Sequence, residues 1–122
     1  NLEWDDSFSP SQSMNKSNIL ISDTSSIRFD FLFVHKKPVI TLDINKDEMK
    51  GYEREYLDLN WTDSSNYDIG PVITKEHIHK LESKIKLSIN NFNKSKLLKY
   101  RSKTIYNFGK GANSITDFFI NL

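Results

Sequence analysis

Three neighbouring hydroxyl-bearing residues, Thr24, Ser25 and Ser26, follow Asp23 directly after a short apolar run. Their hydroxyls can donate to phosphate oxygens, and their small side chains let an anion approach the backbone. The chain then becomes apolar at helical length up to Val34. A strand, a small polar turn and a buried helix form the unit with which α/β proteins hold phosphate, because the first helical N–H groups are unpaired and the helix dipole adds positive charge there. The same hydroxyls could instead only cap the helix, so both interpretations stay open for the turn alone.

The flanking segments predict how this turn is positioned. The apolar residues at 19–22 predict a buried strand, and the β-rich run at 39–42 predicts a second one. The helix between them has about ten residues and should end before Pro38. Two strands joined by a helix form a βαβ unit, so we expect them to be parallel. The turn at 23–26 and the loop after the second strand then lie together at the carboxyl edge of the sheet, where ligands of open α/β sheets bind.

The remainder of the chain is predicted to be a long charged connection followed by helices. Residues 44–70 are rich in charge and tyrosine, and we expect either a functional loop covering a ligand or a surface excursion with a short helix near 46–52. A short extended segment follows at 69–74. Before the first strand, Ser9-Pro10 predicts a helix that runs to about Lys16.

Three helices are expected after the extended segment. The first runs from about 75 to 90 with Thr74 as its cap, the second covers 94–106, and the third covers 113–122. A break that contains glycine separates the last two. The spacing of the apolar residues in the third helix predicts one buried face, which consists of Ile115, Phe118, Phe119 and Leu122.

Composition excludes several classes of function. The chain has 122 residues, enough for one small domain, and its 15 aromatic residues supply area for a core. A net charge of +1 gives no argument for nucleic-acid binding. There are no cysteines, which excludes disulfides and thiolate chemistry, and the longest apolar run is far shorter than a membrane span.

Other groups that could do chemistry are weak candidates. His77 and His79 are two residues apart at the start of a helix and so face different directions, which favours solvated side chains over a shared metal. Gly109 and Gly111 have no strand before them and predict a turn between helices. We therefore predict no metal, no cofactor and no catalytic residue in this chain.

Three stretches, read together, resemble a known family. They are the run from Ile19 to Phe31 (ILISDTSSIRFDF), the run from Lys37 to Ile40 (KPVI), and Gly70-Pro71-Val72. They are similar to the C-terminal part of the CDP-glycerol glycerophosphotransferases, the bacterial polymerases of teichoic acid and capsule. The segment from Tyr106 to Ser114 is similar to the closing segment of that family, so the resemblance covers roughly residues 16–121.

The resemblance implies a GT-B glycosyltransferase-like architecture, of which residues 1–122 would be a single domain: part of the C-terminal, Rossmann-like domain, with parallel strands flanked by helices and a helical tail. In that picture Ser25 and Ser26 contact the donor phosphates, Asp23 and Thr24 belong to the same donor-binding segment, and Asp30 lies one turn on, facing sugar or ribose. The catalytic base would be a histidine outside this chain, which we expect to be a fragment that is inactive alone. The implied partners are CDP-glycerol or a similar donor and a polymer acceptor. The parent would be cytoplasmic, without a membrane span, and peripheral at the inner face of the membrane.

Two alternatives remain beside this interpretation. A glycosyltransferase with another nucleotide-activated donor would use the same scaffold, because a fold does not determine a substrate. A non-catalytic interaction domain would instead dock a partner through the helices at 75–90 and 113–122, and it would bind no nucleotide.

Overall fold

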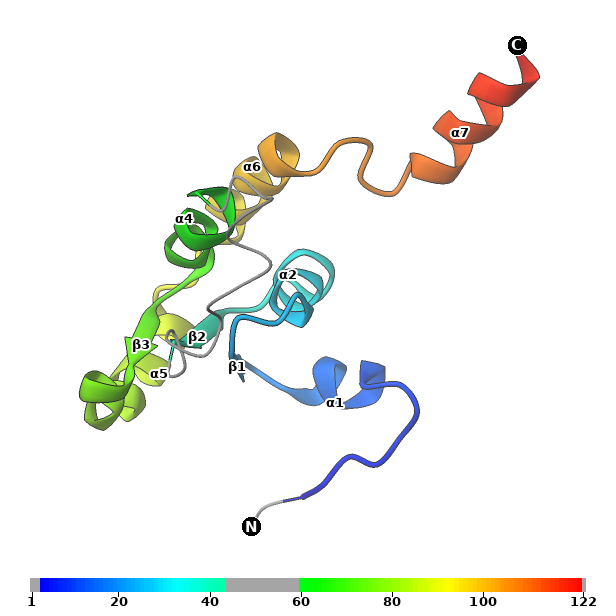
Figure 1. Cartoon of the computed structure of the whole chain (residues 1–122). Coiled ribbons are helices and arrows are strands. Elements are labelled where there is room, and N and C mark those ends of the chain that lie inside the picture. The colour runs from blue at the N-terminus through cyan, green and yellow to red at the C-terminus, as the bar shows by residue number, and fades with distance from the viewer. Residues whose placement is uncertain (1–2, 44–59, 122) are drawn as a thin grey trace, which may run out of the picture. The chain divides into compact units, whose positions relative to one another are not determined.

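The chain folds around a parallel three-stranded sheet that is flanked by helices, as a computed structural model shows (Figure 1). The structure describes residues 3–43 and 60–121, with the backbone alone at 60–64. The strands lie side by side in chain order, so that the second is central: β1 (Leu20–Ser22), β2 (Val39–Asp43) and β3 (Val72–Thr74). The predicted parallel pairing of the first two strands is confirmed.

The central strand carries the core. Val39, Ile40 and Thr41 are consecutive, and all three are at most 1% exposed. Because consecutive side chains of a strand point to opposite faces, both faces of β2 are covered, as in other parallel sheets. This is the layered α/β arrangement that the sequence predicted.

Helices account for most of the other described residues. In chain order they are α1 (Ser11–Lys16), α2 (Ile27–Asp30), the π-helical η1 (Phe31–His35), α4 (Asn60–Ile69), the 3-10 helix η2 (Lys75–Lys80), α5 (Leu81–Asn90), α6 (Lys94–Thr104) and α7 (Gly111–Ile120). The chain divides into two compact units, residues 1–92 and residues 93–122. The sheet belongs to the first unit.

The helix after β1 has the predicted length and burial, but its second half is wider than an α-helix. α2 continues directly into η1, in which Phe31, Leu32 and Phe33 are buried. The helix ends at Lys36, whose φ of 55° places it in the left-handed region. The next residue, Lys37, donates from its ammonium group to three carbonyl oxygens at the end of α1, those of Met14, Asn15 and Ser17.

Two predictions for the middle of the chain need correction. Residues 60–69, predicted as part of a long loop, form the helix α4, whereas the short helix expected near 46–52 lies outside the described residues. Thr74 precedes the next helix but makes no capping hydrogen bond, because its hydroxyl lies 3.1 Å from Nδ1 of His77. The helix therefore begins with the 3-10 turn of η2 and becomes α-helical only at Leu81.

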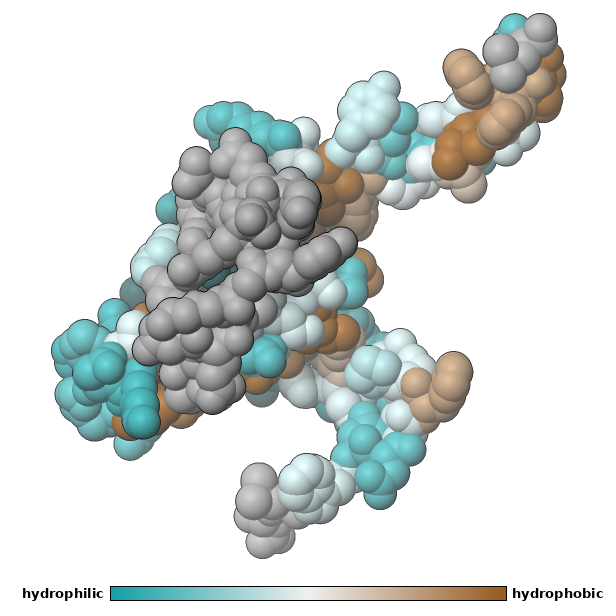
Figure 2. Space-filling view, in the orientation of Figure 1, coloured by the Kyte–Doolittle hydropathy of each residue, from teal (hydrophilic) through white to brown (hydrophobic). Residues whose placement is uncertain are grey.

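The second unit contains α6 and α7, and one prediction made for it is wrong. α6 begins after Asn93, whose side chain accepts a hydrogen bond from the Lys96 N–H. The predicted buried face of the last helix is exposed: Ile115, Phe118 and Phe119 are 61 to 67% exposed, and Figure 2 shows apolar side chains on the surface of α7. The spacing correctly predicted an amphipathic helix, but burial of its apolar face also requires a surface that packs against it.

Candidate functional site

The predicted phosphate-binding turn lies at the carboxyl edge of the sheet. β1 ends at Ser22, and the register pairs Ser22 with Thr41 of β2, two residues before β2 ends at Asp43. The turn at 23–26 therefore emerges beside the last residues of the central strand. Because β3 is also parallel to β2, all three strands end at this edge. The predicted position of the turn is thus confirmed.

Asp23 shapes the first half of the turn. Its Oδ1 accepts a hydrogen bond of 2.9 Å from the Ser25 N–H and one of 3.3 Å from the Ser22 hydroxyl. A carboxylate that accepts from the backbone two residues on forms an Asx turn. Asp23 is therefore a structural part of the turn as well as an exposed acidic group.

The serine hydroxyls of the turn are presented to solvent. Ser25 and Ser26 are exposed, and Thr24 is half-buried. Ser26 occupies the N-cap position of α2 but has helical dihedral angles and makes no side-chain capping hydrogen bond. A residue in this conformation cannot act as an ordinary N-cap, which requires an extended backbone. The interpretation of the Ser26 hydroxyl as a helix cap is therefore wrong, and its interpretation as a phosphate ligand stays a prediction.

Asp30 completes the set of predicted binding residues. It is exposed at the end of α2, four residues after Ser26, so that the two side chains lie on the same side of the helix one turn apart. All five predicted residues thus belong to one continuous segment, 23–30, at the edge of the sheet. The structure places the start of this segment at the carboxyl end of β1, and what its residues bind stays a prediction.

Behind the turn lies a buried polar cluster that the sequence analysis missed. Arg28 is 1% exposed, and its guanidinium contacts the turn, the central strand and α4. It donates to the carbonyl oxygens of Thr24 and Ser25, to the hydroxyl of Thr41 and to the side-chain oxygen of Asn66. An arginine within a mainly apolar helix was the available signal, since a charged residue that is buried there needs partners.

The charge of Arg28 is offset only in part. Burial lowers the pKa of its guanidinium below the usual value, and the nearby Asp23 carboxylate opposes this. Arginine nevertheless stays protonated in proteins. The turn therefore has a buried positive charge behind it and exposed hydroxyls in front of it.

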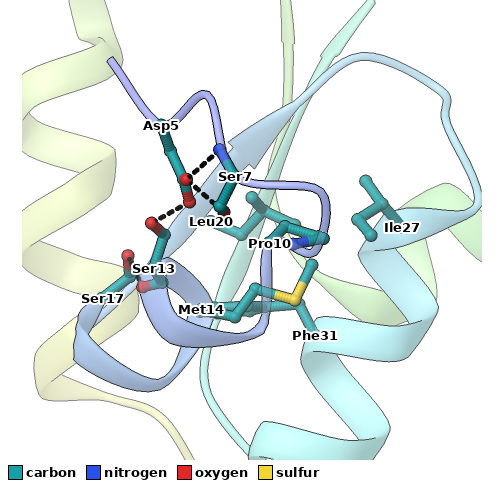
Figure 3. A pocket seen from close by; sticks show the side chains of 9 residues that line it. All are labelled: Asp5, Ser7, Pro10, Ser13, Met14, Ser17, Leu20, Ile27 and Phe31. Carbon is teal, nitrogen blue, oxygen red and sulfur yellow. Dashed lines mark hydrogen bonds between the residues drawn. The ribbon is translucent and has the colours of Figure 1, made fainter. Parts of the chain in front are cut away.

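A pocket of about 270 Å³ begins one residue after the turn (Figure 3). Its floor is apolar and its rim carries hydroxyl groups and one carboxylate. Figure 3 shows Met14 of α1 lying over Phe31, with Ile27 at the side of the pocket. The lining residues are Asp5, Ser7, Pro10, Ser13, Met14, Ser17, Leu20, Ile27 and Phe31. An apolar floor with a few polar groups at the rim is typical of small-molecule sites.

The histidines and acidic residues of the described segments are dispersed. His77 and His79 are both exposed, as predicted, with ring centroids 6.3 Å apart. Within residues 3–43 and 60–121, no three His, Cys, Asp or Glu side chains gather closely enough to hold a metal ion. Over the same residues, no helix has the length and apolar character needed to cross a membrane.

Comparison of this chain with protein-family models, with curated proteins and with solved structures gave no match.

Proposed function

We propose that this chain is the donor-nucleotide-binding part of a CDP-glycerol glycerophosphotransferase-like enzyme. The observation that carries the proposal is the pair of exposed hydroxyls, Ser25 and Ser26, at the start of a buried helix and at the carboxyl edge of a parallel sheet. Unpaired helical N–H groups and these hydroxyls together suit the oxygens of a diphosphate. The buried guanidinium of Arg28 adds positive charge behind them.

In the parent enzyme, a hydroxyl of the acceptor polymer attacks the β-phosphorus of CDP-glycerol. The new P–O bond forms as the bond to the bridging oxygen breaks, CMP leaves with that electron pair, and the hydroxyl proton passes to a base outside this chain. Ser25, Ser26 and the N–H groups behind them stabilise charge that develops on the phosphate oxygens. In this proposal the parent works in the cytoplasm at the inner face of the membrane, where the polymer grows.

The pocket beside the turn gives the donor's base a place to lie. Ile27 lines the pocket and directly follows Ser26, so a phosphate held at the turn brings the nucleoside close to the pocket. A volume of about 270 Å³ lies just below the usual range of ligand pockets, which suits a ring better than a whole nucleotide.

One observation favours a second candidate, a non-catalytic interaction domain. Ile115, Phe118 and Phe119 give α7 an exposed apolar face of the kind that docks a partner. That candidate predicts no affinity for nucleotides.

The other alternative, a glycosyltransferase with another donor, predicts stronger binding of a different activated sugar than of CDP-glycerol.

Titration of the chain with CDP-glycerol, followed by amide NMR shifts, tests the proposal. We expect the largest shifts at residues 23–30. Replacement of Ser25 and Ser26 together by alanine should weaken binding at least about a hundredfold, because each of the two hydrogen bonds to a charged group contributes about 1.5–3 kcal/mol. A matched double variant, Ser83→Ala with Ser95→Ala, removes two exposed hydroxyls elsewhere and should bind as wild type does.

The same titration separates the candidates. Stronger binding of a UDP-sugar than of CDP-glycerol would indicate the other glycosyltransferase. An absence of shifts at millimolar CDP-glycerol and millimolar UDP-sugar, in a sample that gives the spectrum of a folded protein, would contradict donor binding by this chain and favour the interaction domain.

A further inference from the structure

The guanidinium of Arg28 has two ends with different partners. On one end, Nε donates to the carbonyl oxygen of Ser25 at 2.8 Å, and Nη2 donates to that of Thr24 at 2.7 Å. On the other end, Nη1 donates to Thr41 at 2.9 Å and to Asn66 at 2.5 Å. One rigid, planar group thus joins the turn to the central strand and to α4.

The contacts at the first end determine which way the peptide groups of the turn face. A trans peptide group is planar, and its N–H points opposite to its C=O. With the carbonyls of Thr24 and Ser25 drawn inward to Arg28, the N–H groups of Ser25 and Ser26 point away from the core. The Ser25 N–H is held by Asp23, which leaves the Ser26 N–H directed to the side where both serines are exposed.

Stability alone is a poor explanation for an arginine at this position. Its hydrogen-bond partners among the described residues are neutral oxygens, and removing a full charge from water is costly even with good hydrogen bonds. A methionine or leucine at this helical position would avoid that cost, although the four oxygens would then lose their donor. The burial that lowers the pKa of Arg28 is consistent with an environment that disfavours its charge.

We propose that Arg28 is the positioning residue of the donor-phosphate turn: it holds the carbonyls of Thr24 and Ser25 inward, so that the backbone N–H of Ser26 and the serine hydroxyls face the phosphate. This inference rests on the proposed function for the ligand, but the geometry it assigns to the turn exists without a ligand. Arg28 acts through the turn and does not itself contact the donor.

Arg28→Lys tests the inference, because an ammonium group keeps the charge but cannot serve both ends of the network. Thr41→Val is the matched control, since it removes one partner at the far end and leaves both turn carbonyls held. We expect Arg28→Lys to weaken binding of CDP-glycerol about tenfold and to speed amide hydrogen exchange at residues 25–27 without ligand. Thr41→Val should change the affinity by less than threefold and leave exchange at these amides close to wild type.

The two readouts separate failure of this inference from failure of the proposed function. Unchanged affinity and unchanged exchange in Arg28→Lys would overturn the positioning role, as would an equal loss of affinity in Thr41→Val, which would indicate general destabilisation. If wild type does not bind CDP-glycerol but Arg28→Lys still loosens residues 25–27, the donor proposal fails and the role of Arg28 in the turn is supported.

A measurement on the unaltered chain covers the case in which Arg28→Lys does not fold. The Nε–H signal of Arg28 should move when CDP-glycerol binds, because its acceptor, the Ser25 carbonyl, belongs to the peptide group that ends at the Ser26 N–H. The Nε–H signal of Arg101, in the second unit, is the internal control and should stay in place. A shifted Ser26 amide together with an unmoved Arg28 signal would overturn the inference.

Discussion

Gly70, just before β3, allows a close approach of its backbone to that of Val39 in β2, and its replacement by alanine should be strongly destabilising. A Cβ atom built at Gly70 would lie 2.1 Å from the carbonyl oxygen of Val39 and 3.1 Å from its carbonyl carbon. Real Cβ contacts essentially never fall below 3.0 Å, so the two segments must separate by roughly 0.9 Å. Both contacts are with backbone, which cannot rotate away as a flexible side chain can.

The cost follows from what that separation disturbs. Pro71, next to Gly70, accepts a hydrogen bond of 2.9 Å from the Thr41 N–H, and stretching it by such an amount breaks it. Loss of a buried hydrogen bond costs about 1 kcal/mol, and overpacking of a core costs about 1–3 kcal/mol. We therefore expect Gly70→Ala to lower the free energy of unfolding by about 3 kcal/mol. For a chain of this size, that is a fall in Tm of about 12 °C.

Urea unfolding, followed by the methyl NMR signals of Ile40 and Ile73, measures this effect in the unit that contains the sheet. Gly111→Ala is the matched control, because a Cβ there meets nothing within 4 Å and the residue begins the helix α7. It should be neutral or stabilise α7 by up to about 1 kcal/mol. If the free energy of unfolding of Gly70→Ala lies within about 0.5 kcal/mol of the wild-type value, the effect is no larger than that of an ordinary surface substitution. That result would refute the reasoning from close approach.

Three further predictions concern the N-terminal segment and the helix ends. Hydrogen bonds from Ser13 and Ser7 lower the pKa of Asp5 from 3.8 to about 2. The contribution of Asp5 to holding the N-terminal segment is therefore present above pH 3.8 and lost as the pH falls through about 2. The amide NMR signal of Ser13 should report this titration, and Asp5→Asn should remove it. Lys37→Met removes three hydrogen bonds to the end of α1 and should lower the free energy of unfolding in urea by about 1–3 kcal/mol. Lys36→Gly relieves a positive φ and should raise that free energy by about 0.5–1 kcal/mol. Equal effects of the two substitutions would contradict these separate roles of the two lysines. Asn93→Ala removes the cap of α6 and should destabilise that helix by about 1 kcal/mol, measured by hydrogen exchange at its first turn.

Local patterns were enough to predict the order of elements around the sheet. The apolar runs at 19–22 and 39–42 and the helix between them became β1, β2 and the continuous helix of α2 and η1, with the expected parallel pairing. The turn at 23–26 was placed at the correct edge for the same reason, because the direction of parallel strands follows from the length of their connection. Periodicity and turn residues are local properties, so they can be recognised in a short stretch of chain.

The sequence pattern was less informative where burial depends on a distant surface. The stripe on α7 was correctly recognised as amphipathic, but whether it is covered depends on what faces it. In the same way, the helix α4 was hidden in a charged segment, because its hydrophobic periodicity is weak and packing against other elements stabilises such a helix.

Tertiary structure alone decided the polar cluster behind the turn and the role of Gly70. Arg28 and Asn66 are 38 residues apart, and no local pattern relates a guanidinium on one helix to an amide on another. Gly70 reads in the sequence as an ordinary turn glycine, yet its lack of a side chain matters because Val39 of the central strand passes directly beside it. Contacts between residues far apart in the chain exist only once the sheet has formed, and they determine how the turn presents its N–H groups and hydroxyls.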